Sequence, residues 1–530
     1  MSKGTQMING TEYVYEDQPY WDTKKKRGAH KRVYIGKNVN GEFIPNKKHL
    51  LQIELDKAKE NIQLGPVPTS QYLRQFYGAV YLLDQIGDNT RVTHDLKLCF
   101  PDSYKQILSI VYYLILESSP LHRFQKWNRT HKHPYGSDIP SQRSSELLAS
   151  IGDAEKMKFF SLQAERCLET EFLAFDTTSI SSHSELIHQV KYGKNKEGDR
   201  LPQINLALLL GEQSGLPAYY RKLPGNVSDV KTVTNLLKDI TFLKLDKVKL
   251  VMDRGFYSAD NINSMYKNHY KFLIGGKLSL SFVKKKLDSI RTGLASRKNY
   301  YPEVAIFAET HLQEWPYEET KPRGGEQVSE GRRIYIHYYY NDQKATDDRM
   351  RFYHELDRLE EELRLGQKNP ENEKKYDKYF IVSDTPVRGR KIEPKQEAID
   401  TVEKNFGFFV LMSNAINDPI EALKIYRTKD LIEKAFGNLK EHLNMRRESV
   451  ASEECLEGKL FVQFVALIYL CYIKKVMDEK KLFSKYSMQE LLDELDIIEL
   501  FQQPGNHAHI GEITGKQQLL YEAMEVKVPT

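Results

Sequence analysis

The order of predicted elements between residues 171 and 276 limits the fold more than any other feature of the chain. Three strand candidates come first: EFLAFDTTSI, INLALLLG and PAYYRKLPGN. Two helix-then-strand units follow, which gives the order β-β-β-α-β-α-β. Leading strands followed by βαβ units predict a mixed sheet with helices packed against it.

This order suits an RNase H-like fold, in which the first and fourth strands are neighbours. The first strand candidate carries Asp176 near its end, and the fourth, KVKLVMD, ends at Asp253. Two close carboxylates repel each other unless a cation lies between them. Hard oxygen ligands select Mg²⁺ or Mn²⁺ rather than zinc. For either aspartate taken alone, a turn or helix-capping role is the commoner one.

A third acid lies on a helix predicted after the apolar strand FGFFVLMS. In DPIEALKIYRTKDLIEKAFGNLKEHLNMR, one stripe of the helix holds four polar residues: Tyr426, Lys429, Glu433 and Lys440. This set suits a metal ligand flanked by phosphate-binding groups. The alternative is an ordinary surface face with Lys429 and Glu433 as an i,i+4 pair.

The remaining residues divide by composition into further segments. We expect a basic, strand-rich segment over 1–65, a helical DNA-binding domain over 66–170, a core over 171–276 and 404–475, a largely β insertion over 277–403, and a helical tail over 476–530. Residues 1–50 carry ten Lys/Arg and five Asp/Glu, an excess equal to the whole net charge of +5. Cations with interleaved aromatics favour a DNA contact, although a solvated basic strand has the same composition.

Cysteine usage and hydropathy indicate the compartment. The four cysteines are far apart with no CxxC pair, which argues against a disulfide framework or a thiolate zinc site and fits a reducing compartment. The longest apolar stretch, 460–473, is interrupted by Gln463 and is shorter than the roughly 20 residues that span a bilayer. We therefore expect a buried helix, no membrane partner and a cytoplasmic location.

Three short motifs occur in order on strand, strand and helix: FDTTS, DRGFYS and Y-x2-K-x3-E-x6-K. Together they resemble the DDE transposases of bacterial insertion sequences, in the branch marked by a Tyr-Arg-Glu-Lys signature. LPGNVSD, EGKLFVQFVALI and the leader YVYEDQPYWDTKKKRGAHKRVYIGK extend the resemblance over most of residues 10–480. One position departs from it. The signature arginine is Lys429 here, which neutralises a phosphate but lacks a bidentate fork.

The resemblance implies a transposase that cleaves DNA at the ends of its element and joins the freed ends to target DNA. It implies that Asp176, Asp253 and Glu433 are catalytic and bind two Mg²⁺ ions, with Mn²⁺ able to substitute. Further DNA contacts are expected from Tyr426, Lys429, Lys440, Arg427, Arg254 and Trp315, the last by stacking on a flipped base. Expected partners are double-stranded DNA, as terminal inverted repeats and as target, and a second copy in a homodimer on the DNA. The expected location is the nucleoid of a prokaryotic cytoplasm.

Three other classes of function fit part of the pattern. An RNase H-like nuclease or resolvase would share the acids but would not need the basic N-terminal segment or the long insertion. A non-catalytic DNA-binding descendant would lack one of the acids, and all three are present. An unrelated cytosolic scaffold would not explain three motifs in order.

Overall fold

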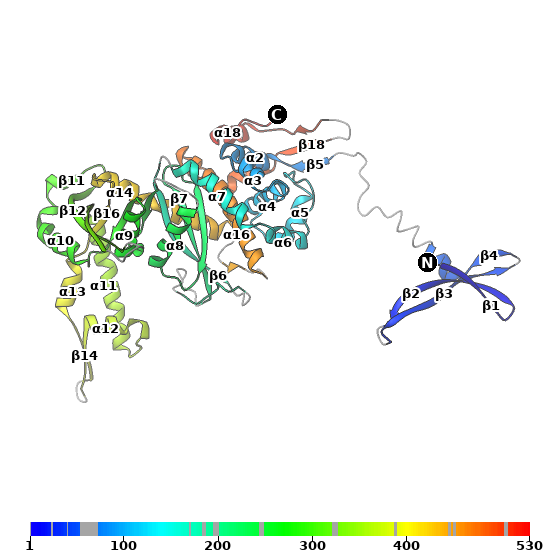
Figure 1. The fold of residues 1–530 in the computed structure, drawn as a ribbon, viewed down its shortest axis with the longest axis horizontal. Coiled ribbons are helices and arrows are strands. Elements are labelled where there is room, and N and C mark those ends of the chain that lie inside the picture. The colour runs from blue at the N-terminus through cyan, green and yellow to red at the C-terminus, as the bar shows by residue number, and fades with distance from the viewer. Residues whose placement is uncertain are drawn as a thin grey trace. The chain divides into compact units, whose positions relative to one another are not determined.

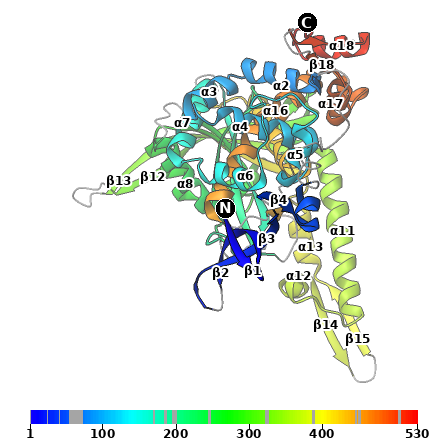
Figure 2. The same cartoon turned by 90° about the vertical axis from the view of Figure 1, so that its right-hand side faces the viewer.

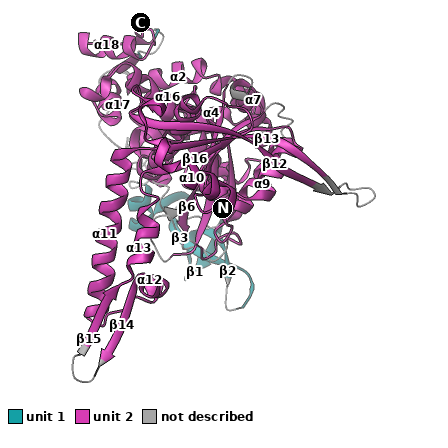
Figure 3. Cartoon of the chain, turned by 90° about the vertical axis from the view of Figure 1, so that its left-hand side faces the viewer, with its two compact units in different colours: residues 1–73, 502–507 teal, residues 74–501, 508–530 magenta. Residues whose placement is uncertain are grey.

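The computed structural model describes residues 2–22, 25–39, 41–53, 73–168, 171–182, 187–193, 201–242, 248–320, 327–385, 389–443, 447–448, 452–502 and 507–530. The chain forms two compact units, coloured in Figure 3: residues 1–73 with 502–507, and residues 74–501 with 508–530. Lys24, part of the predicted basic run, lies outside the described residues.

The N-terminal unit is a four-stranded antiparallel sheet, as the strand-rich composition predicts. Its strands follow the chain order, β1-β2-β3-β4. They are β1 (Ser2–Ile8), β2 (Thr11–Asp22), β3 (Arg27–Val39) and β4 (Glu42–Pro45). Aromatic and basic side chains meet on it, since the Arg32 guanidinium lies 4.8 Å from the ring centre of Tyr15, and Trp21 is 66% exposed.

The second unit is built on a mixed sheet whose central strand order is β10-β9-β6-β7-β8. β6, β9 and β10 are mutually parallel, and β7 is antiparallel to both of its neighbours. The bounds are β6 (Leu173–Ser182), β7 (Gln203–Gly211), β8 (Pro217–Pro224), β9 (Lys249–Met252) and β10 (Lys271–Gly276). The predicted RNase H-like order is confirmed, because the first strand, β6, and the fourth, β9, are hydrogen-bonded neighbours. Figure 1 shows β6 and β7 in this unit.

The connections that lead to β9 and to β10 each carry an amphipathic helix. The connecting helices are α8 (Asp229–Phe242) and α9 (Ala259–Lys267). Ser258 caps α9 by accepting a hydrogen bond from the Asn261 N–H, as is usual for serine at a helix N-terminus. On the far side of the insertion, β16 (Phe408–Ser413) returns to the sheet and pairs antiparallel with β10.

The sequence predicts a largely β insertion, but the insertion contains more helix than this. Its two long strands join the core sheet. β12 (Ile306–Thr320) and β13 (Gln327–Tyr340) form a hairpin, and β13 pairs with β16. The other elements are α10 (Ser281–Leu294), β11 (Tyr300–Tyr301), α11 (Asp342–Arg364), α12 (Glu373–Tyr379), β14 (Phe380–Thr385), β15 (Gly389–Pro394) and α13 (Gln396–Glu403). Figure 2 shows α11 and the β14–β15 hairpin extending away from the sheet.

The predicted helical region packs around α16 (Glu453–Glu479), the helix of the longest apolar stretch. It comprises α2 (Gly78–Asn89), α3 (Val92–Cys99), α4 (Tyr104–Glu117), α5 (Phe124–Asn128), α6 (Ser141–Ala149) and α7 (Asp153–Leu168). By length and composition α16 could cross a membrane, but 83% of its apolar window is buried inside the protein. It is therefore the core helix that the sequence predicts.

The C-terminal segment covers the same helical region. It holds α17 (Met488–Asp496), β18 (Glu499–Gln502), β19 (His509–Ile510) and α18 (Gly515–Ala523). The Tyr521 hydroxyl donates a hydrogen bond to the Gly78 carbonyl at 2.9 Å. This contact ties the end of the chain to the start of α2.

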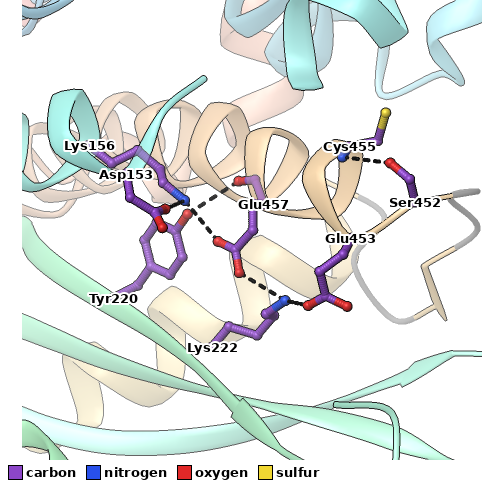
Figure 4. A network of polar contacts seen from close by, with 8 residues as sticks. All are labelled: Asp153, Lys156, Tyr220, Lys222, Ser452, Glu453, Cys455 and Glu457. Atoms are coloured by element: carbon purple, nitrogen blue, oxygen red, sulfur yellow. Dashed lines mark hydrogen bonds and ion pairs between the residues drawn. The ribbon is translucent and has the colours of Figure 1, made fainter. Parts of the chain in front are cut away.

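A buried ion-pair network joins the helical region, the sheet and α16 (Figure 4). The Lys222 ammonium of β8 contacts the carboxylates of Glu453 and Glu457, the latter at 2.8 Å. The Lys156 ammonium of α7 lies 2.9 Å from the other oxygen of Glu457. Burial acts to raise the pKa of Glu457, but the hydrogen bonds from the two lysines outweigh it, so this pKa lies below its ordinary value.

Candidate active site

The strand register brings Asp176 and Asp253 to neighbouring positions on parallel strands. Phe175 of β6 pairs with Met252 of β9, so the next residue on each strand is an aspartate. Side chains at paired positions of parallel strands point to the same face of a sheet. Two aspartates 77 residues apart in the chain thus lie beside each other, as the predicted strand order requires. Asp176, however, is the fourth of the ten residues of β6 and does not lie near the end of its strand as predicted.

Asp253 accepts hydrogen bonds from two directions. Its Oδ1 accepts the backbone N–H of Arg254 at 2.8 Å, so this side chain also caps the 3₁₀ turn Arg254–Phe256. The same oxygen accepts the hydroxyl of Tyr426 at 2.7 Å. The ammonium of Lys429 lies 3.9 Å away. The side chain of Asp253 is 43% exposed, so it remains open to a ligand.

These neighbours keep Asp253 ionised. Burial acts to raise its pKa, but the Tyr426 hydrogen bond and the positive charge of Lys429 act more strongly, and the pKa lies below its ordinary value. Burial and the nearby Asp253 charge raise the pKa of the Tyr426 phenol. Tyr426 therefore donates a hydrogen bond, and keeps its proton, to a carboxylate that stays anionic at neutral pH.

The helix of the third acid is divided in two, which the sequence does not predict. α14 (Pro419–Arg427) begins at Asp418, whose carboxylate accepts the N–H groups of Ile420 and Glu421. It ends at Thr428, and α15 (Lys429–Glu441) starts with the next residue. The single helix expected here is wrong, although both helices still direct polar side chains toward Asp253.

Glu433 lies on α15 on the far side of Lys429. The Lys429 ammonium is 3.4 Å from Glu433 Oε1 and 3.9 Å from Asp253 Oδ1, so one cation bridges two of the predicted catalytic acids. The Glu433 side chain is 59% exposed. The i,i+4 pair that the sequence also suggested is thus present, and it is part of the site.

The structure places the other predicted DNA contacts in different surroundings. Arg254 and Arg427 are exposed, and both line a cavity of about 880 Å³ beside Asp253. Lys440 is half-buried near the end of α15. Trp315 is only 6% exposed, and its indole N–H donates to Asn263 at 2.8 Å. This burial argues against the expected stacking of Trp315 on a DNA base.

The cavity also contains groups that the sequence analysis did not identify. Lys277 and Lys344 line it together with the two glycines at the end of β10. Lys277 directly follows the predicted strand KFLIGG. Its position at the end of a strand beside that of Asp253 could have predicted a cation near this site. Lys344 belongs to α11 of the insertion, and its placement depends on the pairing of β13 with β16.

The chemistry of the donor set fits a hard divalent cation, since Asp176, Asp253 and Glu433 offer only carboxylate oxygens. Among the residues that the structure describes, no three His, Cys, Asp or Glu side chains converge closely enough to hold a metal ion. The ammonium of Lys429 lies close to both Asp253 and Glu433, at 3.9 Å and 3.4 Å. When bound, the metal ions would supply activation of the attacking oxygen and stabilisation of the leaving oxygen.

Asp176 on the first strand and Asp253 after the fourth strand are thus neighbours in an RNase H-like sheet. The family model of the transposase DDE domain matches residues 168–469, and the chain belongs to this family. It is a DNA transposase, a class of enzyme that cleaves DNA and transfers the cleaved strand.

No curated protein matches the chain. Among solved structures, the chain is similar to that described as "Cryo-EM structure of piggyBac transposase synaptic complex with hairpin DNA (SNHP)", with 10% sequence identity and a TM-score of 0.33 over 79% of this chain and 70% of that one.

Proposed function

We propose that Asp176, Asp253 and Glu433 are the catalytic carboxylates and that they hold two Mg²⁺ ions, which Mn²⁺ can replace. The observation that supports this most directly is the side-by-side placement of Asp176 and Asp253 on parallel strands. Both lie within the residues matched by the family model. Three carboxylates leave coordination positions for phosphate oxygens and for the attacking water or 3′-hydroxyl.

The residues around the acids have separate roles in this proposal. Tyr426 orients Asp253 through its hydrogen bond of 2.7 Å. Lys429 leaves its position between Asp253 and Glu433 when metal and DNA enter, and then neutralises a backbone phosphate. Arg254 and Arg427 line the adjoining cavity and contact the same DNA strand, while Lys440 contacts the backbone further along α15.

The proposed substrates are the terminal inverted repeats of the element and its target DNA, with two copies of the chain acting as a homodimer. Joining two ends requires two active sites, which is the physical reason for the dimer. The exposed aromatics and the basic excess of the N-terminal unit favour a role in DNA binding. The proposed location is the nucleoid of a prokaryotic cytoplasm, where such DNA is present.

The test is cleavage of the DNA that flanks the protein's own gene, with and without Mg²⁺. The proposal predicts nicks at the ends of inverted repeats that require the metal and disappear in Asp253→Ala. An RNase H-like nuclease would instead cut without preference for these ends and would transfer no strand. Cleavage by Asp253→Ala at the wild-type rate would refute the assignment of this carboxylate.

A further inference from the structure

The register that aligns the two aspartates continues onto the next parallel strand. Met252 of β9 pairs with Ile274 of β10, so Gly275 follows beside Asp253, just as Asp176 does on the other side. The row across β6, β9 and β10 therefore reads aspartate, aspartate, glycine. The side chain of Tyr426 passes over this glycine to reach Asp253.

The space above Gly275 is filled by the groups that hold Asp253. A Cβ at this position would lie 2.9 Å from the Tyr426 hydroxyl oxygen, 2.9 Å from the Arg254 backbone nitrogen and 3.1 Å from the Arg254 Cβ. Both polar atoms are already committed, since each donates a hydrogen bond to Asp253 Oδ1. A methyl group at 275 would displace at least one of these donors.

Backbone conformation does not require a glycine at position 275. Gly275 does not have a positive φ, so an L-residue could adopt its conformation. Its neighbour Gly276 offers a comparison, because the nearest atoms to a Cβ there belong to the Val410 and Met412 side chains, at 3.3 Å or more. A glycine inside a strand commonly marks a close approach of another group, and at position 275 that group is the pair of donors to Asp253.

We infer that Gly275 is a positioning residue for the reaction, because its bare backbone lets Tyr426 and the Arg254 N–H hold the Asp253 carboxylate in place. This inference rests on the proposed role of Asp253 as a catalytic carboxylate. Groups that orient a metal-binding carboxylate typically contribute 10- to 100-fold to metal affinity or activity. Gly275→Ala should produce a loss on the order of 10- to 100-fold by the same mechanism.

The experiment compares Gly275→Ala with Gly276→Ala, Tyr426→Phe and the Gly275→Ala, Tyr426→Phe double variant. Single-turnover cleavage of repeat-end DNA gives the rate. Emission from bound Tb³⁺, a hard cation that a nearby tyrosine sensitises, reports the geometry of the site without requiring activity. Gly275→Ala should lose cleavage on the order of 10- to 100-fold and change the Tb³⁺ emission. Gly276→Ala should reduce cleavage and change the emission much less than Gly275→Ala does, because it leaves both donors to Asp253 in place.

The double variant tests whether Gly275 acts through Tyr426. Removing the hydroxyl removes one of the two close contacts, so the losses from Gly275→Ala and Tyr426→Phe should not multiply. If Gly275→Ala alone does not fold, recovery of a folded protein in the double variant supports the contact, and failure to recover overturns it. Wild-type cleavage and emission in Gly275→Ala, or losses that multiply, also overturn the inference.

Asp253→Asn, measured in the same assay, distinguishes a failure of the proposed function from a failure of the inference about Gly275. If Asp253→Asn cleaves like wild type, the proposed role of Asp253 fails regardless of Gly275. If Asp253→Asn is inactive while Gly275→Ala is unaffected, only the inference about Gly275 fails.

Discussion

Replacing Lys222 by methionine should destabilise the second unit by about 3–5 kcal/mol, the usual cost of removing one partner of a buried ion pair. The Lys222 side chain is only 3% exposed and contacts both Glu453 and Glu457. Those carboxylates are 32% and 28% exposed, so they would be left partly buried and mutually repelling. Lys156 would still pair with Glu457, which places the expected cost near the lower end of the range.

Guanidinium unfolding followed by far-ultraviolet circular dichroism at neutral pH measures this cost as a shift in midpoint at constant slope. The Lys222→Met, Glu453→Leu double variant should recover most of the loss, because an apolar pair of similar volume often matches a buried ion pair. The pKa of Glu457 is lowered by folding, so its contribution is full above its unfolded pKa and fades as pH falls through its folded pKa. A cost below about 1 kcal/mol for Lys222→Met, or a double variant no more stable than the single, would refute this reasoning.

Three further predictions follow from single contacts. Lys429→Met should lower the slope of log affinity for DNA against log salt by about one, as expected for one lost phosphate contact, and an unchanged slope in filter binding would contradict that role. Gly458→Ala should cost about 1–3 kcal/mol by overpacking, because its Cβ would overlap the Leu148 carbonyl oxygen, and a wild-type melting temperature would count against this packing. Burial lowers the pKa of His337 to about 4 from an ordinary 6.5, so stability should be full above pH 6.5 and fall by up to about 3 kcal/mol as the pH drops toward 4. His337→Gln should flatten this fall in urea midpoints, and an unchanged pH dependence would show that His337 is not its source.

The pairing of Asp176 with Asp253 could be predicted because it depends only on strand order. Three leading strands and two βαβ units place the first and fourth strands together. The strand register then places the two aspartates beside each other. That Tyr426, Lys429 and Glu433 share one polar stripe followed from helical spacing, whereas the hydrogen bond from Tyr426 to Asp253 did not. The division of that helix at Thr428 did not, because neither proline nor glycine marks the position in the sequence.

The positions that could not be predicted depend on contacts between distant segments. Trp315 is buried because β12 packs near α9, where Asn263 receives its indole N–H. No local pattern distinguishes such a tryptophan from an exposed one. The joining of β13 to β16 likewise brings together strands separated by the whole of α11, α12 and α13, and it is this pairing that places Lys344 beside the cavity.

If Asp176, Asp253 and Glu433 bind the same metal ions, Fe²⁺ bound in their place should cut the polypeptide beside all three residues. Fe²⁺ with ascorbate and peroxide generates hydroxyl radicals that cut the backbone close to the ion, with no need for DNA or activity. We expect cuts near residues 176, 253 and 433, and excess Mg²⁺ should suppress them. Each of the variants Asp176→Asn, Asp253→Asn and Glu433→Gln should weaken all three cuts together. Cuts confined to one of these segments, or cuts that persist in all three variants, would contradict it.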